Sequence, residues 1–452
     1  MLPVYILIFI ILMGVVGMVG ADENYVTVYN ENLALVKQIR LMDVSPKNLP
    51  LRFTDVAAKL IPTSVHLRSL SGNKAFQVVE QNFEYDLVSA DKILEKYIDH
   101  QVEIVTESGE LINGALLSKS GNLFVIKTED GIKILPWNDK MAVNVKDLPE
   151  GLITRPTLIW EVVGVKEGQE KLEVSYLTEG LSWHAEYVGV LNEKSTRINL
   201  DAWVSLDNHC GTTYKDAHLK LVAGEVHRAP SREIVRRMAK GVMEAPMDMT
   251  VPTFEEREFF EYHIYELDRP TTIKDNQIKQ ISLFPPAEVS CQKKFYYNAG
   301  KSPKKVEVKV LFKNDKNAGL GIPLPEGIFR IYQKDQESLE FIGEDRISHT
   351  SRNEEVKITV GKAFDLVGER RVVDRRKISQ RSERQTIEIE LRNNKEKEDV
   401  VIIVEENLYY YDWRIEDNNF PYRKVDAYHV EFDIPVKANS KQTLQYTVVY
   451  SW

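Results

Sequence analysis

A cysteine and three of the chain's nine histidines lie close together in the segment DAWVSLDNHCGTTYKDAHLKLVAGEVH, residues 201–227. Thiolate and imidazole groups bind zinc, so His209, Cys210, His218 and His227 are candidate metal ligands. Zinc ligands usually occur in pairs about two to five residues apart. Here His209 and Cys210 are adjacent, and the next two histidines follow after eight and nine residues. We therefore expect no metal ion and no other cofactor, with these side chains at the turns between strands.

Cys210 and Cys291 are the two cysteines of the chain. Paired cysteines outside the cytoplasm tend to oxidise. A Cys210–Cys291 disulfide and two buried thiols therefore both remain open.

Patterns that mark catalytic sites are absent from the sequence. There is no H-E-x-x-H, C-x-x-C, G-x-S-x-G or Walker loop. Glu405 and Glu406 are adjacent, and adjacent residues of a strand face opposite sides, so they cannot act together as an acid/base pair. We expect no catalytic residue, although carboxylates from distant strands could still meet in the fold.

Aromatic residues gather in NLYYYDW, where Tyr409, Tyr411 and Trp413 share one face of an extended chain. Rings at this spacing either close the core of a β-sandwich or stack on a sugar or protein ligand. The core interpretation is preferred, and ligand contact is the alternative.

Basic residues gather in ERRVVDRRKISQRSER, residues 369–384, which holds seven lysines or arginines against three acids. Such charges commonly protect an edge strand from unwanted pairing. The alternative is a patch that docks anionic polymers or lipid headgroups, formed by Arg370, Arg371, Arg375, Arg376 and Lys377.

The elements that carry these residues are mostly strands. Residues 198–208 alternate between apolar and polar side chains, which is typical of a half-buried strand. KVEVKVLFKN and TIEIELRNN repeat the plan, and the three segments end at Asn208, Asn314 and Asn393. Asparagine suits a strand end because it tolerates left-handed backbone and its side chain can bond the turn. The repetition predicts tandem antiparallel β-sandwich modules in a mainly all-β protein; chance similarity among strands is the alternative.

One segment departs from this plan. SADKILEKYIDH, residues 89–100, has helical spacing behind a capping serine, and about five short strands follow it. This order predicts a small SH3- or Sm-like barrel. Sm-like barrels often bind RNA, but residues 91–147 carry seven lysines or arginines against ten acids, and the chain's net charge is −9. We therefore expect no nucleic-acid partner.

A chain of 452 residues is too long for a single core. The Met-rich residues 231–260, interrupted by Gly241, Pro246 and Pro252, predict a flexible loop. The expected divisions are a leader at 1–21, an N-terminal β region at 22–88 packed on the middle sandwich, the helix and barrel at 89–150, the middle β-sandwich with its loop at 151–290, and a C-terminal β-sandwich region at 291–452.

The N-terminus begins with LPVYILIFIILMGVVGMVGA, an uncharged apolar run at residues 2–21. Its length suits a hydrophobic helix across a bilayer, and Val19-x-Ala21 resembles a signal-peptidase site. No basic residue precedes the run, and it is long for a signal peptide. A cleaved signal peptide and a retained membrane anchor therefore both remain open, and each places the rest of the chain outside the cytoplasm.

Several blocks together resemble the domain-of-unknown-function family numbered 4139. They include VTVYNENLALVKQIR, VSYLTEGLSWHAEYVGVL, GTTYKDAHLKLVAGEV and the closing LQYTVVYSW. The resemblance covers nearly the whole exported part and implies an exported β-rich protein with no established activity. His209-Cys210 stands where the family pattern has Asn-Ser, which argues against a family-wide metal site.

These observations favour an exported cell-envelope protein, most simply a non-enzymatic structural or adhesion scaffold. Its loops and edges would contact a protein or glycan partner. The alternatives are an exported hydrolase of glycans or peptides and, third, a metal-dependent module at residues 209–227.

Overall fold

The computed structural model describes residues 22–138, 140–149, 151–224, 254–260, 262–336, 338–410 and 412–452. Strands dominate this part of the chain, and it contains one α-helix, α1 (Ala90–Lys96), and two short 3-10 turns, η1 (Pro46–Asn48) and η2 (Pro62–Ser64). The predicted all-β class is confirmed. No helix in these ranges has the length and apolar character to cross a membrane, and the predicted leader at 1–21 lies outside them.

Strands of the N-terminal region pair with strands from residues 157–273 to form two sheets. β1 shows why strands form here: its alternate residues Asn24, Val26 and Val28 are buried, as a one-sided sheet requires. The larger sheet has eight strands, in the order β16 (Phe254–Phe259), β17 (Tyr262–Leu267), β15 (Tyr214–Ala223), β1 (Glu23–Tyr29), β2 (Leu33–Val44), β12 (Gly168–Thr178) and β4 (His66–Ser69), with β18 (Thr271–Ile273) beside β15. The smaller sheet has three strands, in the order β3 (Leu51–Thr54), β11 (Thr157–Val163) and β5 (Gln77–Glu84).

β16 corrects part of the sequence-based expectation. Residues 254–259 belonged to the predicted flexible loop, but they form an edge strand of the eight-stranded sheet. Most of the predicted loop lies outside the described residues.

The rest of the body is a thirteen-stranded sheet that folds into two packed regions. Its order is β22 (Ser338–Ile347), β21 (Gly327–Asp335), β13 (Leu181–Leu191), β14 (Arg197–Asn208), β19 (Gln277–Tyr297), β20 (Lys305–Lys313), β23 (Glu355–Ser379), β24 (Ser382–Asn393), β29 (Ser440–Ser451) and β26 (Asp412–Asn418). Three further strands complete it, β25 (Val400–Asn407), β28 (His429–Val436) and β27 (Tyr422–Lys424).

β19 joins the two regions without a break. Its first part pairs with β14, and its second part, from Cys291 to Tyr297, pairs with β20 and β25. The boundary expected at residues 290 and 291 therefore falls inside a continuous strand rather than in a linker. The chain passes from one core to the next along β19.

The three strand ends predicted from asparagine form one repeated corner. Asn208, Asn314 and Asn393 are fully buried. Each donates from its amide to a carbonyl in a facing loop, at 3.1 Å to Lys274, 3.0 Å to Ser351 and 3.1 Å to Lys437 respectively.

Each asparagine side-chain oxygen also accepts from a backbone N–H further along the chain, that of Cys210, Gly321 or Lys395, which lie two, seven and two residues on. The left-handed backbone lies elsewhere, at asparagines 276, 353 and 439, each two residues after the facing carbonyl. The expectation that these asparagine side chains bond the turn is therefore right. The expectation that the same asparagines adopt left-handed backbone is wrong.

α1 and five strands form a small separate module. The Ser89 side chain accepts from the Lys92 N–H and caps α1. The sheet order is β10 (Ala142–Asn144), β6 (Gln101–Val105), β7 (Leu111–Ser120), β8 (Leu123–Thr128) and β9 (Gly131–Pro136). Leu135 of β9 and Val143 of β10 pack on the same core, so the sheet curls, but no ladder among the described residues joins these two end strands.

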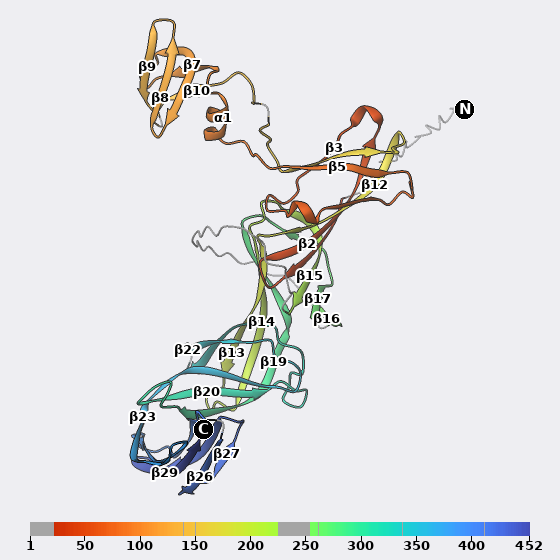
Figure 1. Ribbon diagram of the computed structural model, residues 1–452. Coiled ribbons are helices and arrows are strands. Elements are labelled where there is room, and N and C mark those ends of the chain that lie inside the picture. The colour runs from red at the N-terminus through yellow and green to blue at the C-terminus, as the bar shows by residue number, and fades with distance from the viewer. Residues whose placement is uncertain are drawn as a thin grey trace, which may run out of the picture.

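Three main apolar cores follow the molecule's length. The largest joins the N-terminal sheets to the middle region, the second fills the C-terminal region, and the third lies inside the small module. Figure 1 shows the small module at one end of an elongated molecule, connected to the body by extended chain, with β26 and β29 at the other end.

Candidate functional site

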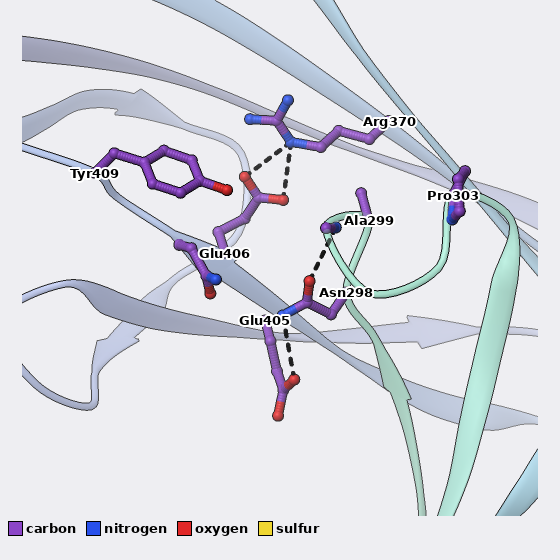
Figure 2. A pocket seen from close by; sticks show the side chains of 9 residues that line it. Asn298, Ala299, Pro303, Arg370, Glu405, Glu406 and Tyr409 are labelled. Carbon is purple, nitrogen blue, oxygen red and sulfur yellow. Dashed lines mark hydrogen bonds and ion pairs between the residues drawn. The ribbon is translucent and has the colours of Figure 1, made fainter.

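A pocket of about 300 Å³ opens in the C-terminal region. The loop between β19 and β20, the middle of β23 and the end of β25 meet around it (Figure 2). Its lining is mostly polar and consists of Asn298, Ala299, Gly300, Pro303, Arg370, Glu405, Glu406, Asn407 and Tyr409.

β25 supplies two carboxylates that point in different directions. Ile402, Val404 and Glu406 share the inward face of this strand, and Glu406 is only 3% exposed. Figure 2 shows Glu406 directed toward Arg370 and Glu405 directed away from it. The predicted divergence of the two side chains is present, although both border the pocket.

Glu406 is held by two partners. Nε of Arg370 donates to both carboxylate oxygens at 3.0 Å, and the Tyr446 hydroxyl donates to one of them. Burial raises the pKa of Glu406, against the opposing effects of Arg370 and Tyr446. A shifted carboxylate in a hollow marks a candidate functional site.

The loop after β19 forms the opposite wall. The side-chain oxygen of Asn298 accepts from the N–H groups of Gly300 and Lys301, which fixes the turn. Its amide donates to Glu405 at 3.5 Å. Nζ of Lys301 and Nζ of Lys309 each lie 3.6 Å from a Glu405 oxygen, so this carboxylate is also balanced by cations.

Tyr409 covers one side of the pocket. Its side chain is 76% exposed, and a Cβ built on Gly300 would lie 3.9 Å from its hydroxyl. Figure 2 shows this hydroxyl directed toward Glu406 and Arg370. Beside it, the Tyr410 ring stacks on Trp452 at 4.9 Å between centroids.

The three predicted aromatic residues therefore do not form one group in the described structure. Tyr409 lines the pocket, Tyr411 lies outside the described residues, and Trp413 packs partly on the C-terminal core. Nε1 of Trp413 donates to the Ala427 carbonyl, and Lys424 lies over its ring. Trp413 thus follows the core interpretation, and Tyr409 is the predicted ring that a ligand can reach.

The predicted anion-docking patch is largely neutralised. Arg370 pairs with Glu406, Arg371 with Glu388, Arg375 with Glu383 and Arg376 with Asp374. Beyond residue 367, the one described strand that pairs with β23 is β24, so this half is a charged edge strand. Lys377 also lies on this edge and makes no ion pair with the residues that the structure describes.

The candidate metal ligands do not converge. The exposed His209 contacts Asp207 and Asn276, and the buried Cys210 donates weakly to the Tyr214 hydroxyl. His218 stacks on Tyr25. His227 lies outside the described residues.

Of the two possibilities for the cysteines, the disulfide is wrong. Cys210 and Cys291 are buried free thiols. The Cys291 N–H donates to Thr196, just before β14, whereas Cys210 follows the other end of β14. A strand of 12 residues spans roughly 40 Å, far beyond the ~7 Å limit between bridged Cα atoms.

Sequence reasoning missed Glu406, Tyr446 and Asn298 as members of one site. A signal for Glu406 was present, because strand alternation places it on the same face as Ile402 and Val404. An acid at an inward position requires a buried partner. The identity of that partner, Arg370, depends on strand pairing that alternation does not specify.

Comparison with known proteins adds no assignment. No family model matches the chain, and no curated protein matches its sequence.

Proposed function

We propose that this chain is a non-enzymatic scaffold of the cell envelope, located outside the cytoplasm, that binds a protein or glycan partner. The apolar run at residues 2–21, as a signal peptide or an anchor, supports the location. The sequence blocks similar to the family numbered 4139 support an exported β-rich protein.

The orientation and ion pairing of the two pocket carboxylates are the observation that carries the proposal. Hydrolysis of a glycosidic bond commonly needs two carboxyl groups that face each other across it, about 5 Å or about 6.5–9.5 Å apart. Glu405 and Glu406 are neighbours on one strand, point apart and are each held by cations. This pocket is therefore suited to holding a ligand rather than cleaving one, which disfavours the alternative of an exported hydrolase.

The elongated arrangement also supports binding. The small module lies at one end of the molecule, away from the C-terminal region (Figure 1). Separated modules can contact more than one partner or bridge two of them.

An assay for hydrolysis tests the proposal. The purified protein is incubated with isolated envelope polysaccharide and with casein, and new reducing ends and new amino termini are measured over time. We expect neither to rise above a blank without protein. Time-dependent release that Glu406→Gln abolishes would overturn the proposal.

A further inference from the structure

The pocket at Arg370 and Tyr409 combines an exposed ring with fixed polar groups. Tyr409 leaves most of its ring accessible, at 76% exposed. Carboxylate and amide groups of Glu405, Glu406 and Asn298 lie across the hollow. A ligand with an apolar face and several hydroxyl groups would match both kinds of surface.

Arg370 offers donors that the protein does not use. Both hydrogen bonds to Glu406 come from Nε. The guanidinium also interacts with the Tyr446 hydroxyl. Of its five N–H groups, several therefore remain for a ligand, and the side chain is 26% exposed. Because Glu406 fixes the guanidinium in place, these N–H groups are oriented before a ligand arrives.

The charges around the pocket cancel. Arg370 is paired with Glu406, Lys301 with Glu405, and Lys309 with both Glu405 and Glu307. Three cations therefore meet three carboxylates. The chain as a whole carries a net charge of −9, which repels polyanions. Acidic polymers are consequently poor ligands for this site.

We propose that this pocket binds a neutral saccharide, with one sugar face on the Tyr409 ring and hydroxyl groups on Arg370, Glu405 and Asn298. The volume of about 300 Å³ is at the small end of the range for ligand sites, ~300–1,000 Å³. The site therefore holds a short part of a glycan. This inference rests on the proposed binding function and names its ligand class.

The test measures affinity with matched variants of the full chain. The neutral probes chitotetraose, cellotetraose, mannotetraose and maltotetraose, and the acidic probe tetragalacturonate, are titrated by calorimetry into the wild-type protein, Tyr409→Ala and Phe364→Ala. Phe364 is the control because it is an aromatic residue of β23, 91% exposed, that does not line the pocket.

We expect at least one tetrasaccharide to bind the wild-type protein and Phe364→Ala equally. Tyr409→Ala should bind it about tenfold more weakly, the effect of losing one stacked ring. The affinity should change little between about 0.05 and 0.5 M salt, because no net charge is engaged.

Three outcomes would overturn the inference: none of the tetrasaccharides binds, Tyr409→Ala binds as well as the wild-type protein, or tetragalacturonate binds more tightly than every neutral probe. None of these affects the proposed non-enzymatic function, which fails only if the envelope polysaccharide or the casein is cleaved. The two proposals can thus fail separately.

Discussion

At the scale of single residues, the buried corner asparagines stabilise the sandwich modules. Replacing Asn393 by alanine leaves the carbonyls of Glu398, Val436 and Lys437 without this donor. Buried groups without a partner are costly, so we expect Asn393→Ala to lower the free energy of unfolding by about 2 kcal/mol. Urea unfolding followed by circular dichroism measures this loss.

The neighbouring Asn394 provides the control, since it is exposed. Asn394→Ala should change the free energy of unfolding by no more than about 0.5 kcal/mol. Equal effects of the two substitutions would contradict the assigned role of the corner.

The two thiols give a pH prediction. Burial raises the pKa of Cys291 to about 11 and also raises that of Cys210. Since thiolate is the reactive form, both should resist iodoacetamide at pH 8 in the native protein and react after unfolding. Mass spectrometry counts the added groups, and recovery of an oxidised Cys210–Cys291 pair would contradict the free-thiol assignment.

The same shift affects stability at alkaline pH. The folded state holds the Cys291 proton more tightly than the unfolded chain does, because the folded pKa is the higher one. The contribution of this thiol to stability is therefore full below its ordinary pKa and is lost as the pH rises toward 11. Unfolding of Cys291→Ser should lack this part of the alkaline decline.

At the scale of elements, substitutions on the inner side of the small module's sheet should destabilise the module, and substitutions on the outer side should not. Ile126 of β8 is fully buried in the module's core, whereas Ile134 of β9 is 64% exposed on the outer side. We expect Ile126→Ala to cost about 3 kcal/mol and Ile134→Ala no more than about 0.5 kcal/mol. Hydrogen exchange of β6 to β8 reports both, and similar protection in the two variants would argue against this sidedness.

The sequence predicts those features of an element that are determined by residues close together in the chain. Alternation along residues 198–208 predicts β14, and the Ser89 cap predicts α1, because both patterns lie within a few neighbouring residues. The passage of β19 from one core to another is not encoded locally, since both of its halves alternate. The meeting of Glu406 with Arg370 depends on the same long-range pairing.

At the scale of the whole molecule, the arrangement in Figure 1 predicts an extended particle. A compact chain of this length would have a radius of gyration of about 22 Å. Small-angle X-ray scattering of the purified protein should give a clearly larger value. A radius near the compact figure would mean that the small module folds back on the body in solution.

Binding without turnover is the central claim, and one incubation tests it most directly. End-labelled tetrasaccharides are mixed with the purified protein, and the bound fraction and the chain length are read from the same sample. The account predicts a saturable bound fraction whose label stays on intact tetrasaccharide. Shortened products that accumulate with time and protein concentration would contradict it.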